Sequence, residues 1–366
     1  MRISWAHHPS ADALASARSA PDDERPACVF AFVSSQCDLA AVGAALAGLG
    51  APVISCTSAG QLGAAGFEQG GITTATVHDG LSVRSFLIRS LKDLDRSLDE
   101  TMAEILAAGA LEVESGTVVG MILSDGLSGV EARLMAGLHQ RLPMTPMVGG
   151  SAADDLRFER ASVYWDGAFH SDAAVLHLIA TELPIVPLRF QHHRPTEHRL
   201  VVTRTSDDRR TIHELNGIPA VHAYAEALGL TPRQVTAPVA SSHPLLLRIG
   251  GEYYTRSIRR LTGAGALELY GTIEPGLVVR VGQTHDIVGT TAAAFAAARE
   301  KVGEPALVIG CDCVLRRLEI QRAGLARDVG KILAAQRVIG FSAYGEQING
   351  LHITHSFTGF MFGAAS

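Results

Sequence analysis

Hydrophobic and polar positions follow one pattern that occurs three times along the chain. A short apolar strand ends in small polar residues, an amphipathic helix follows, and a second apolar strand ends in or beside Ser-Ala. The three copies cover residues 28–60, 118–154 and 306–346. Near-continuous apolar strands on either side of a helix are typical of a β-α-β unit in a sheet covered on both faces. The pattern therefore predicts an α/β fold with repeated β-α-β units.

The first strand of each copy ends in small or acidic residues, at 34–38, 124–126 and 311–313. Ligand clefts in open α/β sheets lie at the carboxyl ends of strands, so these three ends could line one pocket. Alternatively, their Ser and Asp side chains only cap the helices that follow. Both interpretations remain open from the sequence.

The region between the second and third copies is rich in strands. Stretches of β-forming residues with partial alternation, separated by Asp-Gly and Arg-Pro-Thr turn signals, predict antiparallel strands. These strands are expected at 161–165, 173–180, 186–191 and 200–204. A helix is expected at 221–228, and the Pro- and Ser-rich stretch 231–242 after it is typical of a linker.

The length of 366 residues favours two domains at roughly 100–200 residues each. We expect residues 1–26 to form a poorly structured lead-in, 27–215 to form the first domain and 216–366 to form the second. The fold class that results is mixed α and β: two domains, repeated β-α-β units and mixed sheets.

Composition narrows the function. Aromatic residues make up only 5% of the chain, and its 31 basic residues are scattered within a net charge of −6, so nucleic-acid binding and a charged membrane surface are not expected. No apolar run reaches the ~18–20 residues of a membrane-spanning helix, and the first 25 residues lack a secretory signal pattern. The five cysteines form no CxxC or CxxCH motif. We therefore expect a cytoplasmic protein with reduced thiols, whose small-residue helix faces would tolerate self-association into a homo-oligomer.

Several ordered motifs resemble those of the FIST proteins, in which a FIST N-terminal domain precedes a FIST C-terminal domain. The motifs are CTSAG at 56–60, VGGSA at 148–152 with Asp154, HxxPT at 192–196 and FSAYGEQ at 341–347. The resemblance runs from about residue 28 to residue 362. It implies a ligand-sensing module of bacterial signalling, associated with histidine kinases or cyclic-di-GMP enzymes, for which amino acids have been proposed as ligands.

Further segments resemble a subset of stand-alone FIST proteins, the nitric-oxide-sensing proteins (NosP) that bind haem b. These segments are Gln191-His192 with Pro195-Thr196, 199–202, 248–251 and 311–313. The resemblance implies non-covalent haem b, nitric oxide as the ligand and a separate histidine kinase as the partner. No kinase, cyclase or helix-turn-helix segment is recognisable in the chain, which fits a sensor that acts through a partner.

The resemblance selects His192 as the axial ligand of the haem iron. Strand alternation would put His192 and His193 on opposite faces, so only one of them could face a pocket. Phe190 and Arg194 share the parity of His192 and are expected as an apolar neighbour and a propionate partner. His243 is a second candidate ligand. The alternative is that these histidines lie at the surface in a turn-rich loop.

Other candidate residues have simpler interpretations. His177 lies in an apolar strand, where a satisfied core histidine is the more common case. His352 and His355 differ by three positions, which places them on opposite faces of a strand and argues against a shared metal site. Cys311 and Cys313 are expected on one face of their strand in a structural role, with soft-metal binding or redox pairing as the alternative.

An enzyme is not expected. The serines of the strand ends lack a GxSxG elbow, and the chain has no Walker A, GxGxxG or HExxH motif. Asp154 and Glu346 could recognise an amine or could be caps. The sequence thus predicts a haem-based nitric oxide sensor that signals to a histidine kinase. The alternative is a haem-free FIST module that binds an amino-acid-like ligand at the strand ends, and an enzyme of low activity is a third possibility.

Overall fold

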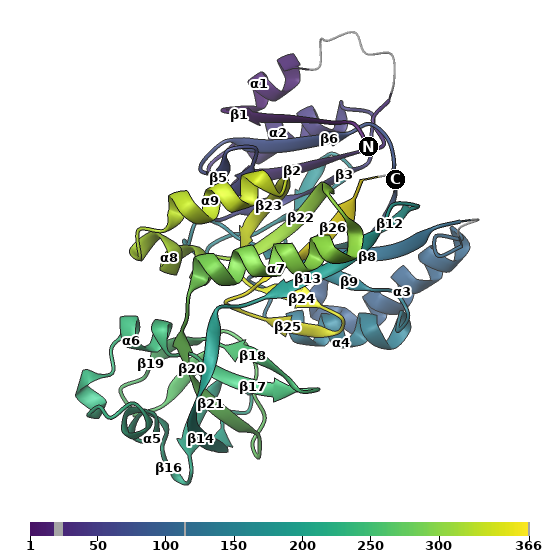
Figure 1. Cartoon of the computed structure of the whole chain (residues 1–366). Coiled ribbons are helices and arrows are strands. Elements are labelled where there is room, and N and C mark those ends of the chain that lie inside the picture. Colours follow the sequence, from purple (N-terminus) through teal and green to yellow (C-terminus); the bar gives the residue numbers. More distant parts are fainter. Residues whose placement is uncertain (18–24, 113–114, 365–366) are drawn as a thin grey trace.

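The computed structural model describes residues 1–17, 25–112 and 115–364. It contains three six-stranded sheets and one eight-stranded sheet. The three six-stranded sheets form a large body, and the eight-stranded sheet forms a small body below it (Figure 1). The mixed α and β class, with mixed sheets, is confirmed.

The first sheet contains the first predicted repeat. Strand β2 (Cys28–Ser34) is buried along its whole length and pairs in parallel with β3 (Val53–Ser58). Between them, α2 (Leu39–Ala47) begins at Asp38, whose carboxylate accepts hydrogen bonds from the backbone amides of Ala40 and Ala41. The sheet is completed by β1 (Ile3–His8), β6 (Ile72–Val77), β10 (Val163–Trp165) and β11 (Ala168–His170).

The second sheet contains the second repeat, formed by β8 (Thr117–Asp125), α4 (Glu131–Arg141) and β9 (Met147–Ala152), with β8 and β9 parallel. Helix α3 (Leu94–Ala107), preceded by a 3-10 turn at Leu91–Asp93, packs with α4 on the outer face. The other strands are β7 (Ser82–Ile88), β12 (Ala174–Thr181), β24 (Glu346–Ile348) and β25 (Leu351–Ile353).

The third sheet contains the third repeat, in which β22 (Pro305–Cys313) pairs in parallel with β23 (Val338–Ala343). The sequence predicts one helix here, but the structure has two, α8 (Val314–Arg322) and α9 (Ala326–Ala335). The break lies at Gly324, whose φ of 72° ends α8 in the left-handed conformation that glycine adopts easily. The remaining elements are β4 (Gln61–Gly63), β5 (Gly66–Glu68), β13 (Ile185–Phe190), β26 (Phe357–Gly363) and the covering helix α7 (Ile287–Val302).

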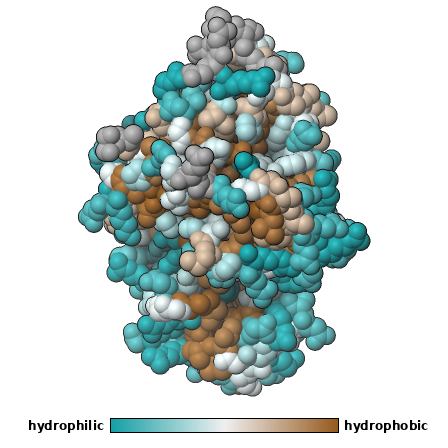
Figure 2. All heavy atoms as spheres, turned by 90° about the vertical axis from the view of Figure 1, so that its right-hand side faces the viewer, coloured by the Kyte–Doolittle hydropathy of each residue, from teal (hydrophilic) through white to brown (hydrophobic). Residues whose placement is uncertain are grey.

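The small body has a hydrophobic core of its own. Its strands run in the order β18-β17-β21-β14-β15-β20-β19, with β16 paired to β15. They are β14 (His193–Thr205), β15 (Thr211–Leu215), β16 (Ile218–Pro219), β17 (Leu245–Ile249), β18 (Glu252–Arg256), β19 (Ile258–Leu261), β20 (Leu267–Leu269) and β21 (Val278–Thr284). Figure 2 shows apolar residues gathered on one face of this body, whose exposed large apolar side chains are Val201, Ile218 and Val278.

Two expectations about the chain's organisation need correction. The predicted linker 231–242 contains a 3-10 turn (Pro232–Gln234) and helix α6 (Ala237–Ser242), because Pro238 suits a first helical turn and Ala240 is buried. Helix α5 (Ala220–Ala227) forms where it was predicted.

The predicted lead-in 1–26 is ordered at 3–8 and 11–16. Strand β1 pairs with β6 as an edge strand, and α1 (Ala11–Ser16), capped by Ser10, buries Leu14. Strand β1 has the polar pattern of an edge strand and gives little hydrophobic signal. This explains why the sequence predicted a poorly structured segment. Residues 18–24 lie outside the described residues.

The large and small bodies do not coincide with the N-terminal and C-terminal halves of the sequence. The chain enters the small body between β13 and β14 and leaves it between β21 and α7, so strands from both halves build the large body. One core cluster takes side chains from all three of its sheets, including Phe32 stacked on Phe341 with ring centroids 4.7 Å apart. Within the described ranges, no helix has the length and apolarity to span a membrane.

Candidate functional site

A cavity of about 250 Å³, the interbody pocket, lies between the large and small bodies. The large body lines it with Gly126, Leu127, Gly129, Glu131, Phe158, Val314, Leu315, Tyr344 and His352, and the small body with Arg210, Arg259 and Tyr270. Two of the three predicted strand ends, those of β8 and β22, therefore meet at one pocket. The end of β2 instead lines a separate open groove of about 630 Å³ with Asp154 and Arg157.

Charges of opposite sign face the interbody pocket from opposite bodies. Glu131 begins α4 on the large body and is only 5% exposed. Burial raises the pKa of Glu131, and the charge of Arg210 opposes that effect. The Arg210 guanidinium lies 3.7 Å from the Glu131 carboxylate and donates a hydrogen bond to the carbonyl oxygen of Gly129 at 2.9 Å. Arg259, from the small body, is half exposed beside its partner Glu268.

The wall of the pocket also carries an imidazole. Burial, followed by the charges of Arg256 and Arg210, lowers the pKa of His352 to about 3. Its Nδ1 is a buried atom with no hydrogen-bond partner in the described part of the chain. The pocket wall thus includes a neutral imidazole in addition to Glu131, Arg210 and Arg259.

The two carboxylates proposed from the sequence have other roles. Asp154 accepts hydrogen bonds from the Tyr344 hydroxyl and from the backbone amides of residues 158–160, so it caps a loop. Although burial opposes the change, these bonds lower the pKa of Asp154. Glu346 is fully buried and accepts hydrogen bonds from the backbone and hydroxyl of Ser356, at 3.0 and 2.6 Å. The pocket carboxylate is Glu131, which no sequence motif indicated.

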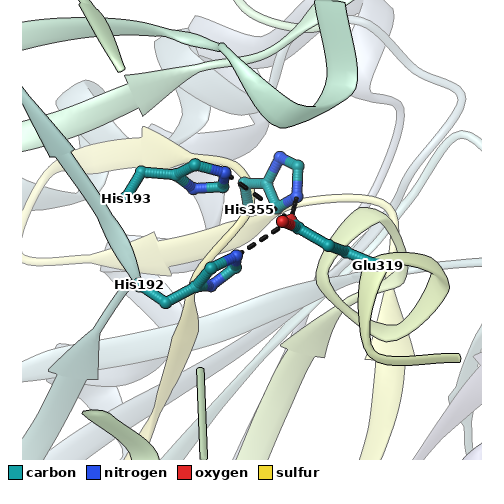
Figure 3. Close-up of side chains that lie close together, drawn as sticks. All are labelled: His192, His193, Glu319 and His355. Atoms are coloured by element: carbon teal, nitrogen blue, oxygen red, sulfur yellow. Dashed lines mark hydrogen bonds and ion pairs between the residues drawn. The ribbon is translucent and has the colours of Figure 1, made fainter. Parts of the chain in front are cut away.

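A second cluster lies at the junction of the two bodies. Figure 3 shows His192, His193 and His355 pointing toward the carboxylate of Glu319. The Nε2 atoms of these three histidines lie 2.8, 3.5 and 3.0 Å, respectively, from Glu319 Oε2. Glu319 projects from α8, His193 begins β14, and His355 lies between β25 and β26. We call these four residues the histidine cluster.

The positions of these histidines correct two expectations. His192 and His193 were expected on opposite faces, but their ring centroids are 4.2 Å apart. Alternation fails because β13 ends at Phe190 and β14 begins at His193, which leaves His192 outside both strands. His355 lies after the end of β25, with a positive φ of 61°, so its spacing from His352 carries no information about faces.

The remaining predicted haem residues do not gather around His192. Phe190 is buried in the core, stacked on Phe357 at 4.8 Å and packed edge-on against Phe295. Arg194 is exposed. His243 is hydrogen-bonded through Nδ1 to a backbone carbonyl and lies outside the four-residue group.

The residues around His192 therefore do not fit haem b. The Nε2 that would bind the iron is instead 2.8 Å from Glu319 Oε2, and the imidazoles of His193 and His355 lie in the same group. The cavity that reaches the cluster at His355 measures about 170 Å³. That volume is below the ~300–1,000 Å³ of pockets that enclose drug-sized ligands.

Burial keeps the imidazoles of His192 and His193 in the neutral form. Burial lowers the pKa of His192 to about 4, although Glu319 opposes the shift, and burial also takes the pKa of His193 well below its ordinary value. For Glu319, burial favours a higher pKa, but hydrogen bonds from His192 and His355 lower it overall. At neutral pH, the neutral imidazoles of His192 and His193 therefore lie beside the carboxylate of Glu319.

Both cysteines of the segment 311–313 lie in the interior of the large body. Cys311 and Cys313 are fully buried, and burial raises the pKa of both thiols far above the range of reactive cysteines. Asp312 points to the opposite face and forms a buried ion pair with Arg316 at 2.6 Å, in line with strand alternation. His177 is a core residue, with Nδ1 bonded to the Ser85 hydroxyl at 2.7 Å.

The repeated β-α-β units place the ends of two of their strands at one small pocket. Comparison with known families matches residues 27–218 to the FIST N domain and residues 220–349 to the FIST C domain. The chain therefore belongs to the FIST family, whose domains are sensory signalling modules for small ligands. The boundary between the matched regions lies next to the boundary predicted at 215 and 216.

Other comparisons add little. No curated protein matches the chain. Among solved structures, phosphoribosylformylglycinamidine synthase II from Thermotoga maritima is similar at 10% identity and a TM-score of 0.21. The match covers 99% of this chain and 71% of the synthase. A similarity of this size supports no conclusion about fold or activity.

Proposed function

We propose that the protein is a haem-free sensor that binds an amino-acid-like ligand in the interbody pocket and signals to a separate histidine kinase. The observation that carries the proposal is the placement of one buried carboxylate and two guanidinium groups around one small cavity, on two different bodies. The kinase as partner comes from the sequence resemblance.

The chemistry of the pocket matches the two ends of an amino acid. A guanidinium binds a carboxylate through paired, charge-assisted hydrogen bonds, which suits Arg210 and Arg259. Glu131 is placed to accept hydrogen bonds from an ammonium group. Burial raises the pKa of Glu131, and the positive charge of a bound ammonium group would lower it again. The ligand would therefore stabilise the ionised form of this carboxylate. Phe158 and Tyr270 supply an aromatic wall for the side chain.

Ligand binding would then change the relation between the two bodies. The ammonium partner lies on the large body and the carboxylate partners lie on the small body, so a bound ligand bridges them. A ligand can shift an equilibrium between two arrangements only by its difference in affinity for them. Here, only the arrangement that keeps Glu131 close to Arg210 and Arg259 supplies both sets of contacts, and this arrangement would be the one that a kinase distinguishes.

Haem-based nitric oxide sensing is the competing proposal, and it comes from the sequence resemblance. It would require His192 to leave Glu319 and the neighbouring imidazoles to move away from its Nε2. Absorption spectra of protein expressed with added haem test it. A Soret band at one haem per chain that is lost in His192→Ala would replace the haem-free proposal.

The direct test is a thermal-shift survey of the common amino acids, followed by calorimetry of the strongest binder. Removing one partner of a buried charged contact costs roughly 2–5 kcal/mol, so Glu131→Gln should weaken binding by at least about 30-fold. Arg259→Gln should weaken binding by a smaller factor, because this guanidinium is half exposed. Arg233→Gln, which removes an exposed arginine outside the pocket on the same body, is the matched control and should bind normally. Equal affinities in all three variants would refute the proposed site.

A further inference from the structure

We infer that the histidine cluster is a binding site for one divalent transition-metal ion. It consists of His192, His193, His355 and Glu319, and their ligand atoms all lie within 4.8 Å of one another. The inference is independent of the amino-acid pocket, since it rests on a different set of residues.

The distances from the three imidazoles to the Glu319 carboxylate are close to those between neighbouring ligands of a metal. In a tetrahedral site with bonds of ~2.0–2.1 Å, neighbouring ligand atoms are about 3.3 Å apart. The three Nε2 atoms lie 2.8 to 3.5 Å from Glu319 Oε2. All the ligand atoms lie within 4.8 Å of one another, and a bound ion would draw the more distant ones closer together.

Burial without hydrogen bonds is the second observation. His192, His193 and His355 are at most 3% exposed. Both ring nitrogens of His193 and Nδ1 of His192 have no hydrogen-bond partner among the residues that the structure describes. A buried polar atom without a partner costs roughly 1–3 kcal/mol. A metal ion would supply the missing partner for the His193 nitrogen that faces Glu319.

The donor set selects the class of ion. Three imidazoles and one carboxylate suit zinc and the neighbouring first-row metals, whereas calcium and magnesium prefer sites made of oxygen. Two of the ligand side chains also have a hydroxyl group beside their second polar atom, and such outer partners orient metal ligands in most metal sites. The Thr284 hydroxyl donates to Glu319 Oε1 at 2.6 Å, and the Ser257 hydroxyl lies 3.3 Å from His355 Nδ1.

The location gives the ion a role at the hinge between the bodies. His192 lies in the first connection to the small body, and His193 begins β14 of that body. The backbone amide of His285, in the second connection, donates to the His192 carbonyl at 2.9 Å. Glu319 and His355 belong to the large body. An ion would therefore join both bodies at the point where the chain crosses between them.

The experiment uses the full chain after removal of metals with a chelator. Titration with Co²⁺ should give one ion per chain and the intense visible bands of a four-coordinate site, and Zn²⁺ but not Mg²⁺ should abolish these bands. His355→Gln and Glu319→Gln should weaken Co²⁺ binding by at least about tenfold. His198→Gln removes an exposed histidine that lies outside the cluster and should leave the titration unchanged.

Two outcomes would overturn the inference. One is the absence of stoichiometric Co²⁺ and Zn²⁺ binding to the wild-type chain. The other is unchanged binding in both cluster variants. If the variants do not fold, as judged by circular dichroism and gel filtration, the site is tested instead by NMR of the histidine rings in the wild-type chain. Zinc must then shift the signals of three buried histidines, and shifts confined to exposed histidines would refute the site. Calorimetry with amino acids tests the interbody pocket separately.

Discussion

Acid should destabilise this protein through histidines that are buried in the neutral form, and His177 is the clearest case. The side chain is fully buried in β12, and burial lowers its pKa from 6.5 to about 3. The unfolded chain binds a proton at His177 below pH 6.5, while the folded chain does so only near pH 3. Above pH 6.5, His177 therefore has no unfavourable effect of protonation on the free energy of unfolding. As the pH falls from 6.5 toward 3, protonation of the unfolded chain lowers that free energy.

The magnitude follows from the size of the shift. Each pH unit below 6.5 costs about 1.4 kcal/mol per histidine that stays neutral in the folded state. Between pH 7.5 and pH 5.0, His177 should therefore remove about 2 kcal/mol from the free energy of unfolding. His352, whose pKa is also lowered to about 3, should contribute a similar loss.

The perturbation is His177→Leu, which replaces the imidazole with an apolar side chain that cannot be protonated. The assay is urea unfolding followed by circular dichroism at pH 7.5 and 5.0, with His198→Gln as the exposed control. On going to pH 5.0, the leucine variant should gain about 2 kcal/mol relative to wild type, and the control should gain nothing. If wild type and His177→Leu lose the same stability within about 0.5 kcal/mol, the reasoning is wrong.

Three further changes test the packing that supports the sites. Asp312→Ala should cost about 3–5 kcal/mol in urea unfolding because it leaves the fully buried Arg316 unpaired, whereas Asp312→Ala with Arg316→Met should recover most of the loss. Gly340→Ala should prevent folding of the large body or cost at least about 3 kcal/mol, since a Cβ there would lie 1.9 Å from the carbonyl oxygen of Gly310; normal yield and melting temperature would contradict this. Asp38→Ala should cost about 1 kcal/mol through loss of the α2 cap, and an unchanged urea midpoint would show that the cap is dispensable.

The sequence predicts the three β-α-β units correctly because their strands are nearly continuous apolar runs bounded by small residues. All three strand pairs are parallel, at β2 and β3, β8 and β9, and β22 and β23. Local patterns of this kind depend on the period of side chains and need no knowledge of distant partners. They do not show that β24 pairs with β9, and β25 with β24, to extend a sheet built from strands of the N-terminal half.

The sites are harder to predict because distant segments build them. Glu319 and His355 are more than 120 residues from His192 in sequence, and no motif joins them. Glu131 and Arg259 line the same pocket only because the small body lies against the strand ends of the large body. The parity argument for Phe190, His192 and Arg194 failed because it assumed one continuous strand where the chain changes sheets.

The central claim is that the interbody pocket recognises both ends of an amino acid. Calorimetry of the wild-type chain with its best amino acid, the matching amine without the carboxylate and the matching acid without the ammonium group tests it most directly. We predict measurable binding of the amino acid and losses of at least about tenfold for each analogue, since each leaves Glu131 or the arginines without a partner. Equal affinity for the analogues, or no binding of any amino acid, would contradict the account.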